Sequence, residues 1–177
     1  MIKDEELVKE ARKGSKDAFS ELVRRHSKPL TMMVLRLVRD EEDARDISQK
    51  VFLSAYQGLP RFIMASSFKT WLYSIAMNAV RDHLRKRNPV MIPDVADQLP
   101  DPAESPADQL EKAHYLARLR GAMETLPLKQ RLTLQLRVYE AMDYKGIARI
   151  LGGTAGGARG NFFQAVKTLR ERLGSEE

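Results

Sequence analysis

The sequence predicts an all-α protein in which two helical domains are joined by a proline-rich, acidic linker. Apolar residues recur at helical spacing, and the alternation typical of strands is nearly absent. Five of the eight prolines lie between residues 89 and 106. Residues 88–113 carry a net charge of −5, whereas residues 1–87 and 114–177 carry +6 and +5. We therefore expect domains at 1–87 and 108–177 and a linker at 88–107, with an ordered surface loop of one domain as the alternative.

The first domain is expected to contain three long helices, at about residues 16–37, 41–57 and 68–87. Each begins after a side chain that suits an N-cap, and these caps are Ser15, Asp40 and Ser67. Three acidic residues follow Asp40, where the helix dipole favours negative charge. Gly58 and Pro60 end the second helix, and Pro89 ends the third.

The second domain is expected to contain four helices. Pro127 separates the first two, Asp143 is suited to cap a short third helix, and Thr154 is suited to cap the last. A turn at Gly152-Gly153 stands between the third and fourth. The last helix has an apolar face made of Ala158, Phe162, Ala165, Val166, Leu169 and Leu173.

The composition excludes several classes of protein. Cysteine is absent, and the three histidines, His26, His83 and His114, lack metal-ligand spacing. A phosphate-binding glycine loop with its lysine is missing, and so is a nucleophile elbow, so we expect neither an enzyme nor a cofactor nor a small-molecule substrate. No apolar run approaches the ~20 residues that span a bilayer, so we expect a cytoplasmic protein without membrane insertion.

The helix at 68–87 has one apolar face and one basic, polar face. The face opposite the apolar stripe carries Thr70, Ser74, Met77, Asn78, Arg81 and Arg85, and the helix ends in a run of cations at 85–87. Such a face suits a phosphate backbone and base edges, although an ordinary solvated face has the same composition. In the preceding loop Phe62 could stack on unpaired bases, whereas Phe68 and Trp71 lie on the apolar face and fit the core better.

Two further segments suggest interaction surfaces. The acidic helix at 40–56 could bind a basic partner, or it could be a capped, solvated helix. Residues 128–173 have the order of a helix-turn-helix, although a plain three-helix bundle is the alternative. In the helix-turn-helix interpretation the last helix enters the major groove and presents Gly156, Gly160, Phe163, Gln164 and Lys167, with Arg159 at the flank.

Together these segments resemble the extracytoplasmic-function (ECF) group of the sigma-70 family of bacterial RNA polymerase sigma factors. The resemblance covers about residues 5–87 and 108–173. The string DEEDARDISQKVFLSAY resembles the helix that binds the clamp coiled coil of the polymerase β′ subunit, and FKTWLYSIAMNAVRDHLRKR resembles the helix that reads the −10 element. The string LPLKQRLTLQLRVYEAMDYKGIARILG resembles the start of the domain that reads the −35 element and docks on the β flap.

The resemblance assigns residues to three surfaces. For polymerase binding it implies Asp43, Asp46, Gln49, Phe52 and Tyr56. For the −10 element it implies Arg61, Phe62, Ser66, Lys69, Thr70, Ser74, Asn78, Arg81, Arg85, Lys86 and Arg87, with Asp82 matching the helix pattern. For the −35 element it implies Thr154, Arg159, Gly160, Asn161, Phe163, Gln164 and Lys167.

The chain departs from the family pattern at a few positions. Position 50 is usually acidic and is Lys50 here. Gly157, Ala158 and Gly160 stand where the family usually has Thr, a branched apolar residue and Ser. Each glycine costs roughly 1 kcal/mol of helix stability relative to alanine, so we expect a frayed start of the last helix or weaker −35 binding.

The implied function is promoter selection by a subunit without catalytic chemistry. Its implied partners are core RNA polymerase, promoter DNA and a cognate anti-sigma factor, and in the holoenzyme it would be nucleoid-associated. The alternative is a helix-turn-helix transcriptional regulator that binds duplex DNA without entering polymerase, which we would expect to dimerise on a palindrome.

Overall fold

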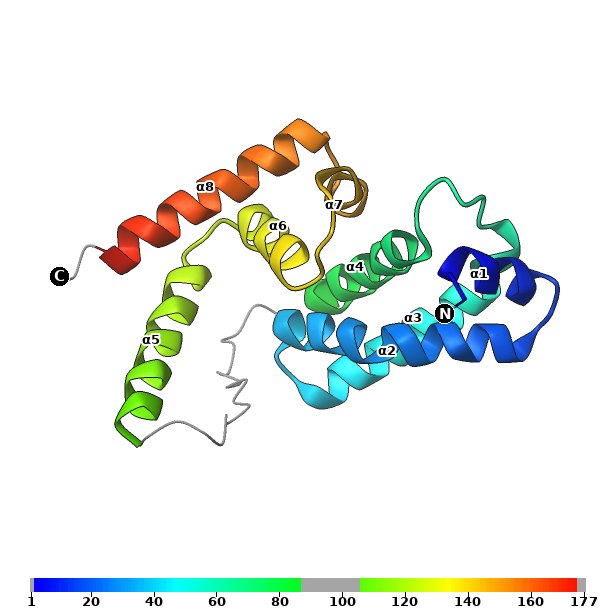
Figure 1. The fold of residues 1–177 in the computed structure, drawn as a ribbon, viewed down its shortest axis with the longest axis horizontal. Coiled ribbons are helices and arrows are strands. Elements are labelled where there is room, and N and C mark those ends of the chain that lie inside the picture. The colour runs from blue at the N-terminus through cyan, green and yellow to red at the C-terminus, as the bar shows by residue number, and fades with distance from the viewer. Residues whose placement is uncertain (1, 87–105, 175–177) are drawn as a thin grey trace. The chain divides into compact units, whose positions relative to one another are not determined.

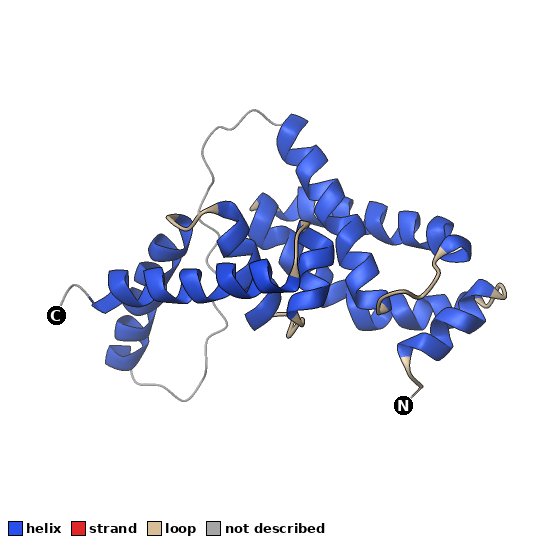
Figure 2. Cartoon of the chain, turned by 90° about the horizontal axis from the view of Figure 1, so that it is seen from above, coloured by secondary structure: helices blue, strands red, loops and turns tan. Residues whose placement is uncertain are grey.

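The computed structural model describes residues 2–86 and 106–174, and the regular structure in these two ranges is entirely helical (Figures 1 and 2). The predicted all-α class is therefore confirmed. The chain divides into two compact units, the first built from α1–α4 and the second chiefly from α5–α8. Most of the predicted linker, and Arg87 before it, lie outside the described residues. Pro106 and Ala107, which we had placed in the linker, are instead the first residues of α5.

The first unit contains α1 (Asp4–Arg12), α2 (Lys16–Val38), α3 (Glu41–Gly58), a short 3-10 helix η1 (Leu59–Arg61) and α4 (Phe68–Lys86). The second contains α5 (Pro106–Glu124), α6 (Leu128–Val138), α7 (Tyr144–Leu151) and α8 (Ala155–Gly174).

All five predicted N-caps are present. In each, a side-chain oxygen accepts a hydrogen bond from the backbone N–H three residues later, which contributes about 1 kcal/mol to helix stability. The donor–acceptor distances are 3.2 Å at Ser15, 2.9 Å at Asp40, 3.1 Å at Ser67, 2.7 Å at Asp143 and 3.0 Å at Thr154.

In the first unit, α2 packs against α1, α3 and α4. The buried side chains at this centre are apolar and come from all four helices; they include Val8, Leu22, Leu30, Val34, Val51 and Leu72. The short helix α1 is also held by polar contacts. Its Asp4 accepts a hydrogen bond from Arg25 Nη1 at 3.0 Å, and Asp4 Oδ2 lies 2.6 Å from His26 Nε2. At its other end, Arg12 donates to the carbonyl of Pro60 in η1 at 3.5 Å, so α1 supports the segment that leads into the loop before α4.

Glu21 on α2 accepts hydrogen bonds from Arg24 and Arg25 at 2.7 Å, and these lower its carboxyl pKa from 4.5 to about 2. Because the pKa of Glu21 is lower in the folded state, its ionised carboxylate stabilises the fold at pH values above 4.5. This stabilisation is lost as the pH falls towards 2 and the carboxylate is protonated. We therefore expect Glu21→Gln to lower the melting temperature at pH 7 and to change it much less at pH 2. Thermal denaturation of both proteins at the two pH values tests this. An equal loss of melting temperature at pH 7 and at pH 2 would mean that Glu21→Gln acts through packing and not through the carboxylate charge.

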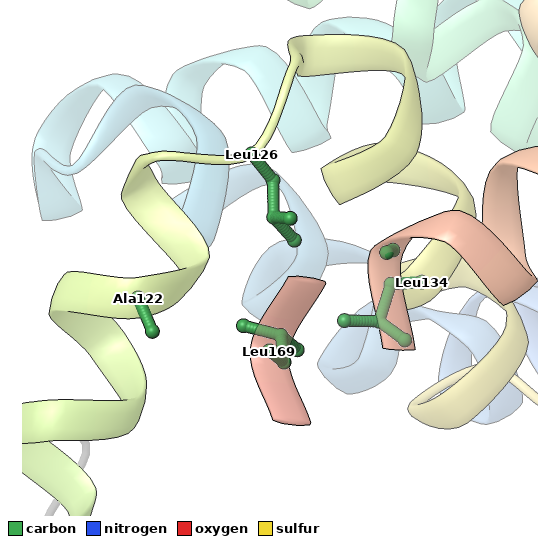
Figure 3. Close-up of a cluster of buried hydrophobic side chains, with 5 residues drawn as sticks. Ala122, Leu126, Leu134 and Leu169 are labelled. Carbon is green, nitrogen blue, oxygen red and sulfur yellow. The ribbon is translucent and has the colours of Figure 1, made fainter. Parts of the chain in front are cut away.

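The second unit has its own apolar core, shown in Figure 3. The buried members come from α5, the α5–α6 connection, α6 and α8, and are Ala122, Leu126, Leu134, Ala165 and Leu169. Leu119, Met123, Phe162, Val166 and Leu173 pack around them. The apolar face predicted for the last helix is thus confirmed.

The connection from α7 to α8 depends on glycine. Gly152 and Gly153 have φ values of 72° and 126°, a region that side chains disfavour. Helix α8 then begins at Ala155, where Thr154 caps it, despite glycines at 156, 157 and 160. The structure therefore does not show the frayed start that the glycines had suggested. The predicted order of helix, short helix, glycine turn and longer helix is present.

Candidate nucleic-acid and protein interfaces

Helix α4 presents a polar stripe away from its packed face. Ser74, Asn78, Arg81 and Arg85 lie within about 60° of one another at 100° per residue. Asn78 and both arginines are exposed, whereas Met77, which the sequence placed on this face, is only 2% exposed and belongs to the core. Arg81 donates to Asn78 Oδ1 at 3.2 Å, and Arg85 donates to Asp82 at 3.1 Å. The first of these contacts uses the Asn78 oxygen, which leaves the NH2 group of that amide as its donor.

The loop at residues 62–67 does not present all the side chains that the sequence suggested. Phe62 is only 6% exposed, and its ring stacks on Trp71 with centroids 4.5 Å apart. The Thr70 hydroxyl is hydrogen-bonded to Ser67 at 2.9 Å. Phe62 and Thr70 therefore hold the loop and the start of α4 in place and are not surface contacts. This placement corrects the expectation that the Phe62 ring is available to stack on a base.

The other residues predicted to contact the −10 element differ in how exposed their side chains are. Arg61 and Lys86 are exposed, and Ser66 is half-buried. The Lys69 ammonium lies 5.5 Å from the centre of the Tyr73 ring. Ser74 donates its hydroxyl hydrogen to the carbonyl of Thr70 at 2.9 Å, which leaves its oxygen as an acceptor. Sequence reasoning overlooked Ile63, which is exposed in the middle of the loop.

Helix α3 has an outward stripe with mixed polar and apolar character. Asp46 and Gln49 are exposed on it, Leu53 follows at 57% exposure, and Tyr56 makes an edge contact with Phe19 at 4.9 Å. Leu53 was missed by sequence reasoning, although its position, four residues after Gln49, was a sufficient signal.

Two residues predicted for polymerase binding lie off this stripe. Phe52 is half-buried on one flank. Asp43 lies on the other flank, where its Oδ2 atom is 3.4 Å from His83 Nε2 of α4. Asp43 thus contributes to the contact between α3 and α4 within the unit.

The outward side of α8 combines cations, an amide and an exposed ring. The guanidinium of Arg159 lies 5.5 Å from the centre of the Phe163 ring, and Phe163 is exposed. Gly160, Gln164 and Lys167 are exposed as well, and Lys167 Nζ is 3.8 Å from Glu171. Asn161 is half-buried, and Thr154 serves as the cap.

Gly160 offers a direct test of the glycine cost in α8. A Cβ atom added at Gly160 would meet nothing within 4 Å, and the backbone at this position is helical. Gly153, in contrast, has a φ of 126°, which side chains disfavour. We expect Gly160→Ala to raise the free energy of unfolding of the second unit by about 1 kcal/mol, and Gly153→Ala to lower it. Chemical denaturation followed by circular dichroism measures both. A stabilising Gly153→Ala would contradict the conformational argument.

Across residues 2–86 and 106–174 no cluster of three or more metal-ligating side chains occurs, and no helix there is long and apolar enough to cross a membrane.

Comparison with known proteins agrees with this division into two units. The model of sigma-70 region 2 matches residues 22–90, and the model of sigma-70 region 4 matches residues 116–169. The RNA polymerase sigma-H factor of Pseudomonas aeruginosa is 31% identical, covering 96% of this chain and 93% of its own length. The ECF RNA polymerase sigma-E factor of Escherichia coli K12 is 28% identical, covering 97% and 95%.

A solved structure also matches. CnrH, determined in complex with the cytosolic domain of CnrY, superimposes with a TM-score of 0.73 at 26% identity, covering 98% of this chain and 99% of CnrH. The two matched regions account for most of the chain, and the similarity to sigma-H extends over nearly its whole length. The chain therefore belongs to the ECF group of the sigma-70 family of RNA polymerase sigma factors.

Proposed function

We propose that this sigma factor holds core RNA polymerase through the outward stripe of α3, reads and opens the −10 element with α4 and the loop before it, and reads the −35 element with α8. The observation that carries the proposal is the polar stripe of α4. It places the Asn78 amide, hydrogen-bonded to Arg81, on the same exposed stripe as Arg81 and Arg85, on a helix whose opposite face is packed. This combination suits a strand that offers both phosphates and base edges.

Opening the −10 element requires bases to leave the duplex stack, which costs a few kcal/mol per base. The residues that can offset this cost belong to the first unit. Arg61 and the arginines of α4 would bind phosphates, and the Asn78 amide would hydrogen-bond a base edge. The flipped base would lie between the loop at 62–67 and the Asn78 side of α4.

Binding to core polymerase is assigned to Asp46, Gln49, Leu53 and Tyr56 on α3, facing the clamp coiled coil of β′. This stripe is polar at Asp46 and Gln49 and apolar at Leu53 and Tyr56, and polar groups beside an apolar patch are typical of a protein interface. Lys50 replaces the acidic residue usual in the family and changes one polar contact. The second unit would dock on the β flap while α8 lies in the major groove, with Arg159 and Lys167 on phosphates.

The test is run-off transcription with core polymerase on a library of genomic fragments. The proposal expects discrete transcripts only when the protein is added, and one copy of it co-eluting with core. Salt-dependent binding of the free protein as a dimer to a palindrome, without co-elution, would instead support the regulator that acts without polymerase. Family membership already disfavours that alternative.

We also propose a protein inhibitor as a partner, an anti-sigma factor. CnrH is bound by the cytosolic domain of CnrY, and CnrH resembles this chain over almost its full length. The exposed apolar residues of α3 and α8, Leu53 and Phe163, give such a partner surfaces to cover. Covering them would block polymerase and DNA binding together.

A further inference from the structure

Asp82 is an acidic residue on a helix whose other charged side chains are basic. Helix α4 contains four lysine and arginine residues and a single carboxylate, that of Asp82. At 100° per residue Asp82 lies about 40° from Asn78 around the helix axis, so its carboxylate borders the polar stripe. Negative charge at this place opposes the binding of phosphates, which the rest of the stripe favours.

The fold does not account for an aspartate at this position. The Asp82 side chain is 62% exposed, so it fills no place in the core of the first unit. Aspartate is a weak helix former, and the helix dipole favours cations over anions towards the C-terminal end of a helix. A neutral or basic residue would therefore suit α4 itself better.

The contact that Asp82 makes engages one of the two arginines of the stripe. Arg85 Nη2 lies 3.1 Å from Asp82 Oδ1. Arg81 is engaged in a similar way by Asn78 Oδ1 at 3.2 Å, but a carboxylate binds a guanidinium more strongly than a neutral amide does. A phosphate that approaches the stripe must therefore compete with Asp82 for Arg85, and it also meets the negative charge of the carboxylate.

We propose that Asp82 is an intramolecular competitor of DNA, whose carboxylate holds Arg85 and thereby weakens sequence-independent binding of α4 to phosphates. The inference rests on the proposed binding of DNA by the polar stripe and adds a contact that limits it. Because the pair is exposed, it is weak, so Arg85 is released when a strand binds, and the result is a tuning of affinity. Non-promoter sites are in great excess in a genome, so a lower affinity for them leaves more of the protein available to core polymerase.

The experiment titrates a labelled non-promoter duplex with the full chain at several salt concentrations. Asp82→Asn removes the charge and keeps the size of the side chain. We expect it to tighten binding about two- to fivefold, as the loss of an exposed ion pair predicts. Log affinity should also fall more steeply with log salt concentration, by up to about 1 in slope, because Arg85 becomes available to a phosphate. The melting temperature should stay that of wild type.

Glu41→Gln is the matched control, because Glu41 pairs with Arg45 on α3 at 2.9 Å and is 68% exposed. It makes the same change of net charge and releases an arginine that is not on the polar stripe, so its gain in affinity should be clearly smaller. A second control places Asp82→Asn in a chain that already carries Arg85→Ala. There it should gain no more affinity than Glu41→Gln does.

Three results would overturn the inference. They are unchanged or weaker binding by Asp82→Asn, a gain equal to that of Glu41→Gln, and a gain that persists in full without Arg85. Failure of the proposed function gives a different result. If Arg85→Ala alone left DNA binding unchanged, the polar stripe would bind no phosphate, and the inference would fail with it. If Arg85→Ala weakened binding and Asp82→Asn gave no gain, only the inference would fail.

Discussion

Replacing Leu53 with aspartate is expected to remove most of the affinity for core RNA polymerase. Leu53 lies midway along the outward stripe of α3, between Gln49 and Tyr56, and 57% of it is exposed in the free protein. Apolar residues at the centre of an interface contribute 2 kcal/mol or more, and a carboxylate buried there without a partner adds a penalty of similar size. We therefore expect the dissociation constant to rise at least ~30-fold, measured by fluorescence anisotropy of labelled protein titrated with core.

Ile2→Asp provides the matched control for Leu53→Asp. Ile2 is 56% exposed in the same unit and receives the same change of chemistry, so it should bind core as wild type does. Both variants should keep the wild-type melting temperature, because neither side chain supports the core. Unchanged core affinity in Leu53→Asp would contradict the assignment of polymerase binding to this stripe. A loss shared by both variants would point to a general effect of added negative charge.

The helices and their caps could be predicted because they depend on neighbours in the sequence. Ser15 caps α2 through Ala18, and Asp40 caps α3 through Asp43, so each contact lies within four residues. The apolar face of α8 follows from periodicity in the same way. Local rules of this kind require no knowledge of which other helix is adjacent.

The details of the candidate sites depend on contacts between distant residues, and these were not predictable from spacing. Phe62 and Ile63 are adjacent apolar residues in one loop, and only the position of Trp71 decides which is buried. The same holds for Asp43, whose contact with His83 spans 40 residues. Helix α1 was overlooked although its buried residues Leu7, Val8 and Ala11 recur at helical spacing. Only its pairing with α2 through Asp4 leaves no periodic signal.

The second large effect is expected at Asn78, the residue best placed to read a base. Its Oδ1 atom accepts a hydrogen bond from Arg81 at 3.2 Å, and its side chain is exposed, so its amide NH2 group is the donor that a base could accept from. Losing a base contact of this kind costs about 1–3 kcal/mol and relaxes specificity at one position. We expect Asn78→Ala to lower holoenzyme affinity for the single-stranded −10 region about 5- to 150-fold on the preferred sequence, and much less on a fragment with that base changed.

Arg85→Ala separates base reading from phosphate binding, because Arg85 lies on the same stripe and is exposed. A lost phosphate contact weakens all sequences alike and lowers the slope of log affinity against log salt concentration by about 1. Asn78→Ala should leave that slope unchanged, since it removes no charge. If the two variants showed the same sequence dependence and the same salt slope, Asn78 would act only by orienting Arg81, and base selection would have to be assigned elsewhere on the first unit.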